Sequence, residues 1–529
     1  MRLDENLMLT FSFHCPLPHG LHARPAGALA RCAARFTSSI TLVNCRNARR
    51  ANAKSALALV GADVAPEEAC LLEIAGPDAQ AAHQTLTHFI LHELAGCDTP
   101  LTPPAPGSDG ALPVFLARTA SPLLRGNGVS PGIALGVPVT FTPADLHRLA
   151  QSEPAADQPT QHQQLLTAWH CVREQLAQEA AAAQGDAAQI LAAHGELLAD
   201  EALEEALFSQ RRARNAPAAL ACAIDALRLP FRQSRSDYLR QRELDVQDLG
   251  LRLAACLSRD PQLQVPTLHE AAIVLCRGTM TPGQLLALRG PHLRGIVMDA
   301  GAETSHTAIL ARAFSLPLLC VPPGAHPQMQ QANTLLLDAR HGVLIADPDA
   351  VAGRWFTLEQ EKPRPLPRRE TAASPVPLIT PALVALNEAP ADKYEVIKRL
   401  TDTLEIHQRA VSGVEAERAI WQREAVFSTA LGFSVAIPHC KSPAILHNSL
   451  AVLRLKTPLP WGDGVDIQLV VMLALKAQAQ AEHLRLFSAL ARKLMHSGFR
   501  EQLMSAPTSE ALVAFLQTEL GIEAGAAQA

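Results

Sequence analysis

The sequence is poor in aromatic residues, which make up 4% of its 529 residues, and it lacks a long apolar run. No stretch of about 18 uncharged apolar residues occurs, which argues against a transmembrane helix. The first 15 residues carry charges where a signal peptide needs its apolar segment. We therefore expect a cytoplasmic protein that is not embedded in a membrane.

The sequence also has no strong excess of positive or negative charge. The net charge is -5, and no long basic run or aromatic residues interleaved with lysine and arginine are present, so a nucleic-acid partner is not indicated. The 11 cysteines are scattered without a Cys-x-x-Cys pair, so neither a disulfide framework nor a zinc site is predicted. We expect buried, reduced thiols and no bound metal.

Hydrophobic residues make up 48% of the sequence and charged residues 18%, which is enough apolar material to build several globular domains. Two proline-rich stretches, 97–113 and 361–377, interrupt the secondary-structure patterns and have the composition of linkers. The predicted organisation is a domain over 1–96, a linker over 97–119, a domain over 120–358, a linker over 359–377 and a domain over 378–522.

Each of the three domains combines strand and helix patterns. The first alternates strands over 9–13, 38–43 and 68–74 with helices, which predicts a small open-faced α/β sandwich. The middle domain has strand-like segments at both ends, while residues 160–257 are almost wholly helical, with Asn215 as a helix N-cap and Pro217 in the first turn. A helical subdomain is thus inserted into an α/β domain, and the last domain is again α/β.

The first candidate site is His22, in "PHGLHARPAGALA", which directly precedes a predicted helix with Pro25 in its first turn. An imidazole at this place can accept a phosphoryl group whose oxygens meet the exposed N–H groups of the helix and the Arg24 guanidinium. The alternative is an ordinary residue beside a helix cap. His19, three residues earlier, has no such helix.

"GLHARPAGALA" followed by "ANAKSALALV" resembles HPr, the histidine-phosphorylated carrier of the bacterial phosphoenolpyruvate:sugar phosphotransferase system. The resemblance implies that His22 carries phosphate on Nδ1, supported by Arg24. Ser55 matches a serine that some HPr proteins use as a regulatory phosphosite, and a plain helix N-cap is the alternative role.

The second candidate is His306, in "GAETSHTAILAR". Small residues before it leave room for a phosphate-bearing partner, and the hydroxyls of Thr304, Ser305 and Thr307 are expected to orient its ring. The segment resembles the phosphohistidine region of Enzyme I, and the likeness extends over 126–136, 190–207, 238–253 and 335–348. It covers the N-terminal half of that family, including the helical insert that docks HPr.

The third candidate is His439, in "STALGFSVAIPHCKSPAI", which resembles the active-site segment of fructose/mannitol-type EIIA domains. The resemblance implies that Arg423 lies near the phosphate and that His483 is a second active-site histidine. It departs from the family in being poorer in glycine before the histidine.

Together the resemblances imply a multiphosphoryl transfer protein in which phosphate passes from His306 to His22 and on to His439, toward a sugar-specific EIIB and its membrane permease EIIC. Transfer between histidines needs alignment and charge stabilisation rather than a new covalent scheme. The C-terminal Enzyme I barrel of about 300 residues, which binds phosphoenolpyruvate and Mg²⁺, has no counterpart before the EIIA-like domain. No cofactor is therefore expected in this chain.

Three hypotheses remain open. A separate complete Enzyme I charges His22 in trans, with its own HPr as a further partner. Alternatively, a barrel on another polypeptide charges His306 directly. In the third hypothesis, the chain is a non-catalytic regulatory or degenerate module of the phosphotransferase system.

Overall fold

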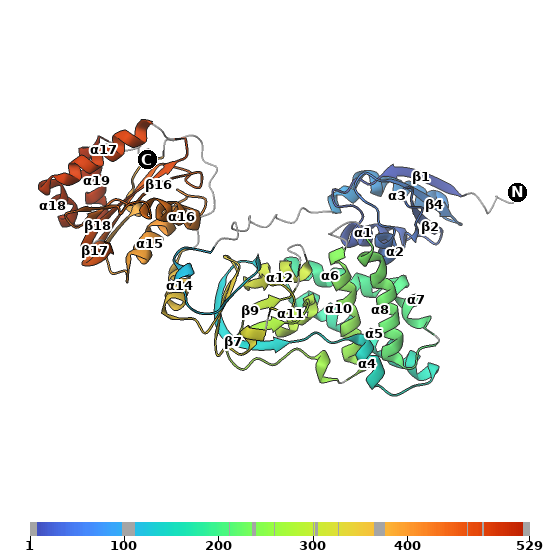
Figure 1. The fold of residues 1–529 in the computed structure, drawn as a ribbon. Helices are drawn as coiled ribbons and strands as arrows, with labels where there is room; N and C mark the ends of the chain where they lie inside the picture. Colours follow the sequence, from blue (N-terminus) through green and yellow to red (C-terminus); the bar gives the residue numbers. More distant parts are fainter. Residues whose placement is uncertain are drawn as a thin grey trace. The chain divides into compact units, whose positions relative to one another are not determined.

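The computed structural model describes residues 8–97, 112–210, 212–234, 240–258, 260–299, 301, 305–325, 327–363, 376–462, 464–478 and 481–521. The chain forms two compact units, one of residues 1–110 and 122–347 and the other of residues 111–121 and 348–529 (Figure 1). The predicted multidomain α/β class is confirmed. Among the described residues, no helix is both long and apolar enough to cross a bilayer.

The first part of unit 1 is the expected open-faced sandwich. Its four strands lie in the order β1-β4-β2-β3, with helices against one face. Alternating burial along the strands follows from the alternating apolar residues. The elements are β1 (Leu9–His14), α1 (Ala23–Ala33), β2 (Ser39–Asn44), β3 (Arg50–Asn52), α2 (Ala56–Gly61), β4 (Ala69–Ala75), α3 (Ala79–His92) and η1 (Leu94–Cys97).

The predicted helical insert is also present. Asn215 caps α8 by accepting from the Ala218 amide at 2.9 Å, and Pro217 lies in the first turn, as expected. Asp78, in contrast, precedes α3 without capping it, because its carboxylate accepts from the Thr37 and Ser38 amides. The insert comprises α4 (Leu146–Ser152), α5 (Gln158–Ala182), α6 (Asp186–Leu198), α7 (Glu201–Phe208), α8 (Ala216–Arg232) and α10 (Glu243–Leu257).

The rest of unit 1 is built on an eight-stranded sheet in the order β5-β12-β11-β7-β8-β9-β10-β6. Its central strands β7, β8 and β9 pair in parallel and are rich in buried aliphatic residues. The elements are β5 (Leu123–Arg125), β6 (Asn127–Ser130), β7 (Ile133–Phe141), η3 (Pro261–Leu263), β8 (Ala272–Cys276), α11 (Pro282–Leu288), β9 (Leu293–Met298), α12 (His306–Ala313), β10 (Leu318–Cys320), α13 (Pro327–Gln330), β11 (Leu335–Asp338) and β12 (Val343–Ala346).

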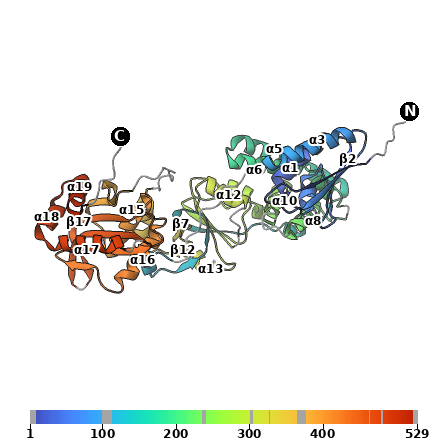
Figure 2. The same cartoon turned by 90° about the horizontal axis from the view of Figure 1, so that it is seen from above.

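Unit 2 is a three-layer α/β/α domain. Helices α17 to α19 lie on one side of its sheet and α15 and α16 on the other (Figures 1 and 2). The strand order is β13-β17-β18-β15-β14, and β16 also pairs with β18. The elements are β13 (Val384–Glu388), α15 (Lys393–Ile406), α16 (Gly413–Glu424), β14 (Ala430–Gly432), β15 (Val435–Ala436), β16 (His439–Ser442), β17 (Ser449–Gly462), β18 (Val465–Lys476), α17 (Ala481–Met495), α18 (Ser497–Ser505) and α19 (Ser509–Leu520).

Unit 2 also includes residues that the sequence analysis assigned elsewhere. Helix α14 (Ala350–Glu361), expected at the end of the middle domain, forms ion pairs with α15 through Arg354 and Glu395. The segment 112–119, expected as linker, includes η2 (Leu116–Arg118), and its Phe115 amide donates to the buried Glu417 carboxylate at 3.1 Å. Proline content alone did not reveal these contacts, because they depend on residues far apart in the sequence.

Candidate functional site

The His306 ring lies at the first position of α12, and Ser305 is the N-cap of that helix. Its Nδ1 is 2.9 Å from Oδ1 of Asp245, which lies on α10 of the helical insert. A neutral imidazole donates from one nitrogen and keeps its lone pair on the other. Because Nδ1–H donates to Asp245, Nε2 is left as the nucleophilic atom.

A second buried histidine extends this contact into a chain of groups. Nε2 of His194, on α6, is 3.3 Å from Asp245, and its Nδ1 is 3.3 Å from Asp248. Asp248 is held by the Arg252 side chain at 2.9 Å and by the Gly283 amide at 2.9 Å. A Cβ on Gly283 would lie 2.6 Å from the Asp248 carboxylate, so a larger residue there would displace that carboxylate.

The two histidines have opposite pKa shifts. Burial and the nearby Arg242 guanidinium together lower the pKa of His306 to about 4, although the Asp245 carboxylate acts in the opposite direction. Burial also disfavours the charged form of His194, but the carboxylates of Asp245 and Asp248 outweigh it and raise its pKa to about 9. At neutral pH, His306 is therefore a neutral acceptor and His194 is an imidazolium between two carboxylates.

His194, Asp245 and His306 also offer three ligand atoms within 4.8 Å of one another, the arrangement of a metal site. A metal ligand must be a deprotonated histidine. The raised pKa of His194 opposes this, because at neutral pH each ring nitrogen carries a proton, 3.3 Å from a carboxylate. The group is better suited to hold the His306 ring than to hold a cation.

Stability should depend on pH through His194. Because its pKa rises from an ordinary value of about 6.5 to about 9 on folding, its contribution to the free energy of unfolding is complete below pH 6.5 and is lost as pH rises through 9. We expect the thermal midpoint of the wild-type chain minus that of a His194→Gln variant to decrease as the pH is raised from 6.5 to 9. His147→Gln removes an exposed histidine paired with Asp225 and is the control. A constant difference between wild type and His194→Gln over this range would contradict the assignment.

The hydroxyls beside His306 have other partners than its ring. Ser305 Oγ accepts from the Ala308 amide at 3.2 Å, and Thr307 Oγ1 donates to the Met280 carbonyl at 2.7 Å. These bonds fix the helix start, while Asp245 takes the orienting role that the sequence analysis gave to the hydroxyls. Thr304 lies outside the described residues.

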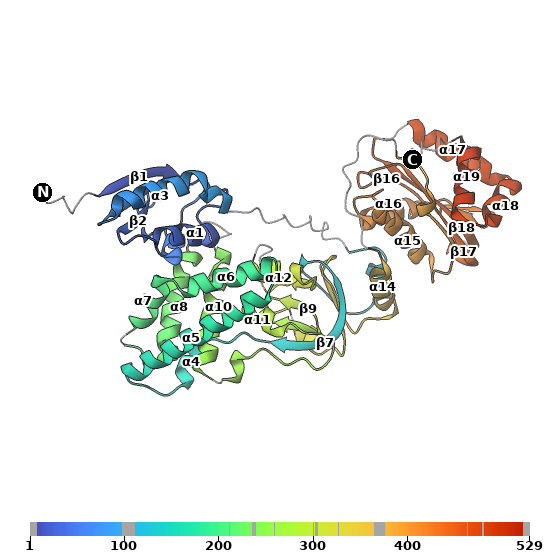
Figure 3. The ribbon, with the colours of Figure 1, turned by 180° about the vertical axis from the view of Figure 1, so that it is seen from behind.

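His22 is the N-cap residue of α1 and is buried within unit 1, at 2% exposure. Its carbonyl accepts from the Ala26 amide at 2.9 Å and so starts the predicted helix. Helix α6 packs against both α1 and α12, the two helices that begin at His22 and His306 (Figure 3). The side chain of Arg24 lies outside the described residues.

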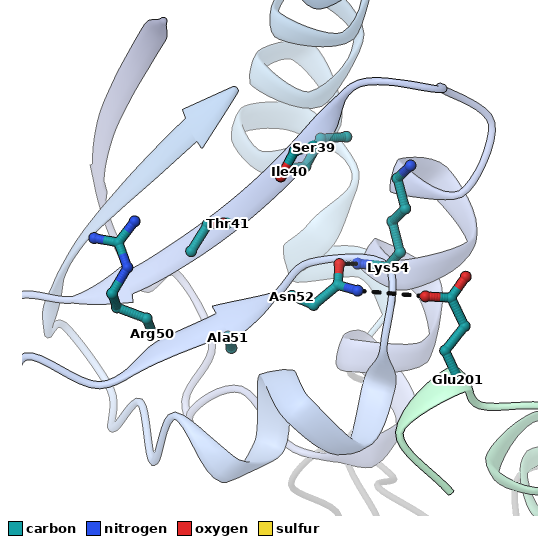
Figure 4. Close-up of a pocket in the computed structure, with 8 residues that line it drawn as sticks. All are labelled: Ser39, Ile40, Thr41, Arg50, Ala51, Asn52, Lys54 and Glu201. Atoms are coloured by element: carbon teal, nitrogen blue, oxygen red, sulfur yellow. Dashed lines mark hydrogen bonds between the residues drawn. The ribbon is translucent and has the colours of Figure 1, made fainter. Parts of the chain in front are cut away.

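The HPr-like part docks on the helical insert through a small set of polar contacts. Ser55 is the N-cap of α2, as one reading of the sequence predicted, and its hydroxyl also donates to Asp200 Oδ1 at 2.5 Å. The Leu57 amide donates to the other oxygen of Asp200 at 3.0 Å. Beside them, the Asn52 side-chain amide donates to Glu201 Oε2 at 3.4 Å (Figure 4). These two residues, with Arg50 and Lys54, line a cavity of about 540 Å³.

Further contacts make this interface continuous. Arg31 on α1 forms an ion pair with Glu196 on α6, and Ser234 donates to Asp63 at 2.6 Å. A Cβ on Gly27 of α1 would lie 2.8 Å from the Glu196 carboxylate, so the small residue permits close packing. The buried apolar residues of the HPr-like part and of the insert form a single cluster. The part of the insert around Glu196, Asp200 and Ser234 is thus covered by a domain of the same chain.

In unit 2, His439 begins β16, and the structure brings Arg423 to it. Arg423 Nε donates to Nε2 of His439 at 3.0 Å, while Nδ1 lies 3.0 Å from the Ile437 carbonyl. The ring therefore has its proton on Nδ1 and directs the lone pair of Nε2 toward a guanidinium. His483 lies in α17, and its side chain is outside the described residues.

The loop before His439 contains a turn in which residues other than glycine adopt positive φ values. Gly432, Phe433 and Ser434 have φ values of 83°, 55° and 60°, so three consecutive residues adopt the left-handed conformation. Glycine enters this region freely, whereas Phe433 and Ser434 do so at a cost in conformational energy. The turn is therefore formed with one glycine, Gly432, and two residues that have side chains.

The site residues predicted from the sequence did not include His194, Arg242, Asp245 or Asp248. A signal was available, because Arg242, Asp245 and Asp248 recur every third residue and so share one face of the helix, which is buried beside the apolar Val246 and Leu249. Charged residues on such a face are rarely buried without a partner or a function.

Comparison with known proteins relates four parts of the chain to known protein families. Family models match residues 9–91 (PTS HPr component phosphorylation site), 125–242 (PEP-utilising enzyme, N-terminal), 269–342 (PEP-utilising enzyme, mobile domain) and 377–519 (phosphoenolpyruvate-dependent sugar phosphotransferase system, EIIA 2). The chain is thus a composite of phosphotransferase-system domains, and its domain content is similar to that of the multiphosphoryl transfer proteins.

Individual relatives share parts of this organisation. Multiphosphoryl transfer protein 2 of Escherichia coli is 32% identical over 355 residues, which are 67% of this chain and 42% of that protein. The phosphoenolpyruvate-protein phosphotransferase of Cupriavidus necator is 32% identical over 245 residues, 43% of this chain and 41% of that protein. The crystal structure of IIA-Ntr from Neisseria meningitidis covers 26% of this chain and 96% of that protein, with 27% identity and a TM-score of 0.25. The chain spans less than half the length of the Escherichia coli and Cupriavidus necator proteins.

Proposed function

We propose that the chain is a phosphohistidine relay of the phosphoenolpyruvate-dependent sugar phosphotransferase system, a phosphotransferase that exchanges phosphate between His306 and His22 and passes it on to His439 in the cytoplasm. The observation that carries this proposal is the contact between the His306 ring and Asp245. Its Nδ1 is bonded to Asp245, which leaves Nε2 as acceptor. His439 has the same arrangement, with Nδ1 against a backbone carbonyl.

An arginine lies near each of the two acceptor histidines, His306 and His439, where it can neutralise the negative charge of a phosphoryl group. Arg423 contacts the acceptor nitrogen of His439 directly. Arg242 is buried, and its guanidinium lies 3.7 Å from Asp245 and close enough to lower the pKa of His306. We assign both arginines to neutralising phosphoryl oxygens, the usual role of guanidinium groups. Arg24, Thr304 and His483 remain proposed supporting residues on the strength of the family resemblance.

Supply of phosphate is proposed to come from outside the chain. The mobile-domain match ends at residue 342 and the EIIA match begins at residue 377, and helix α14 fills part of that interval. A (β/α)₈ barrel needs about 200 residues or more. A separate complete Enzyme I, which would bring its own Mg²⁺, would therefore charge His22.

The onward partner is proposed to be a sugar-specific EIIB of the fructose/mannitol class, with its membrane-bound EIIC. Apolar side chains are exposed close to His439 in sequence: Val426 at 81%, Phe427 at 73% and Phe433 at 58%. Arg423, which contacts His439, also donates to the Phe427 carbonyl at 3.1 Å. Exposed apolar groups beside a reactive centre are typical of a protein-docking surface.

Labelled phosphoenolpyruvate distinguishes the modes of supply. With the full chain and purified Enzyme I, we expect label on His22, His306 and His439, and none when Enzyme I is omitted. His22→Ala should abolish all labelling, while His306→Ala should leave His22 and His439 labelled. Label without Enzyme I, or no label with it, would refute the relay as proposed. Loss of all label in His306→Ala with His22 intact would instead favour a barrel in trans that charges His306.

A regulatory role without transfer is the alternative. It is favoured only if sugar uptake is unchanged when His22, His306 and His439 are all replaced by alanine.

A further inference from the structure

Two cysteines that the relay does not use lie in contact inside the helical insert. Cys171 is on α5 and Cys256 is in the last turns of α10, and both are partly buried. Their Sγ atoms are 2.7 Å apart. A disulfide bond is about 2.05 Å long, so the sulfurs are not bonded but need little movement to become so.

The contact is directional. The Cys256 thiol donates to Cys171 Sγ, and the Gln175 side-chain amide donates to Cys171 Sγ at 3.5 Å and to Cys256 Sγ at 3.9 Å. The thiolate is the nucleophilic form of a cysteine. Burial, together with Cys171, raises the pKa of Cys256 to about 12. Cys171 is therefore the sulfur that attacks first, and Cys256 is the one that follows.

The two helices hold the sulfurs in place. One turn before Cys256, Arg252 donates to both carboxylate oxygens of Glu179, on α5, at 3.0 and 2.9 Å. Helices α5 and α10 also pack against each other directly. Side chains on rigid, packed elements keep their relative positions better than side chains on loops.

We propose that Cys171 and Cys256 form a reversible redox modification site that closes into a disulfide by exchange with a small disulfide such as oxidised glutathione. The Cys171 thiolate attacks one sulfur of oxidised glutathione, whose S–S bond breaks and releases one glutathione thiolate. Cys256 then loses its proton to solvent, attacks the Cys171 sulfur and expels the second glutathione. Two protein thiols are oxidised, and one glutathione disulfide is reduced to two thiols.

The modification would act on α10, the helix that carries residues of the His306 site. Helix α10 also carries Arg242 at its N-cap and Asp245 and Asp248 in its first two turns. A covalent link between α5 and the other end of α10 restrains the element that positions the His306 ring. Disulfides in a reducing compartment are usually transient and regulatory rather than structural.

Redox titration of the full chain tests the site. The protein is equilibrated in buffers of increasing ratio of oxidised to reduced glutathione, alkylated, digested and analysed by mass spectrometry. We expect a linked Cys171–Cys256 peptide to accumulate at a lower ratio than glutathione adducts on the exposed Cys45 and Cys222. If both peptides remain separately alkylated while Cys45 and Cys222 carry glutathione, the proposal is overturned.

Variants check the order of attack and the consequence. Cys256→Ser should leave a stable glutathione adduct on Cys171, whereas Cys222→Ser should leave the linked peptide unchanged. Oxidised wild type should unfold at a temperature higher by about 5 °C or more than the reduced protein. The proposal would be contradicted if Cys171 carried no glutathione in the Cys256→Ser variant. It would also be contradicted if oxidation raised the unfolding temperature of that variant as much as that of wild type. None of these readouts depends on phosphoryl transfer.

Discussion

Replacing Asp245 with asparagine should slow the passage of phosphate from His22 to His306 by about 10²-fold or more at neutral pH. The carboxylate accepts from Nδ1 of His306 and so keeps the lone pair on Nε2. An amide can instead donate to Nδ1, which stabilises the tautomer with its proton on Nε2 and removes the nucleophile. The reaction is followed by charging the full chain with Enzyme I and labelled phosphoenolpyruvate, quenching at short times and mapping label to the two histidines.

A matched control is available within the same subdomain. Asp225 is paired with His147 at 2.6 Å on the exposed surface of the helical insert, and both side chains are about half exposed. Asp225→Asn changes a histidine–carboxylate pair of the same kind away from the site, and its rate should equal that of wild type. If Asp245→Asn transfers within twofold of wild type, the tautomer does not control acceptance at His306.

Ser55→Asp should undock the HPr-like domain from the helical insert, raising the exchange rate of the Leu57 amide about 10²-fold. Ser55 and the Leu57 amide share the two oxygens of Asp200. A carboxylate at position 55 places like charges together, which costs several kcal/mol at an interface. Leu57 lies in the first turn of α2, where amides have no acceptor within the helix, so its protection reports docking.

Hydrogen exchange with mass spectrometry on the peptide that covers residues 55–60 measures this effect. Ser12→Asp places the same charge on an exposed position of β1 and should leave the exchange of this peptide unchanged. Unaltered protection in Ser55→Asp would show that Asp200 does not hold the domain. A phosphate on Ser55, the proposed regulatory modification, should act in the same direction and more strongly, because it carries more charge.

Much of the fold was predictable because its signals are local. The strands at 9–13, 38–43 and 68–74 and the cap at Asn215 follow from alternation and side-chain chemistry within a few residues. Of the three chemical centres, the pairing of Arg423 with His439 was anticipated from family resemblance.

The rest depends on contacts that no local pattern encodes. The chain from Asp248 through His194 and Asp245 to His306 joins α10, α6 and α12, which are separated by long stretches of sequence. The placement of α14 with unit 2 likewise rests on the Arg354–Glu395 ion pair between two helices. Side-chain partners at such separations become known only when the elements are packed.

The covered surface of the helical insert has a consequence for reaction order. Since the HPr-like domain already occupies that surface in the same molecule, exchange of phosphate between His306 and His22 should be first order, with a half-time that does not change on dilution. A free HPr would have to displace a tethered competitor whose effective concentration is of the order of millimolar. The chain would therefore exchange phosphate internally faster than it trades with a dilute pool of carriers.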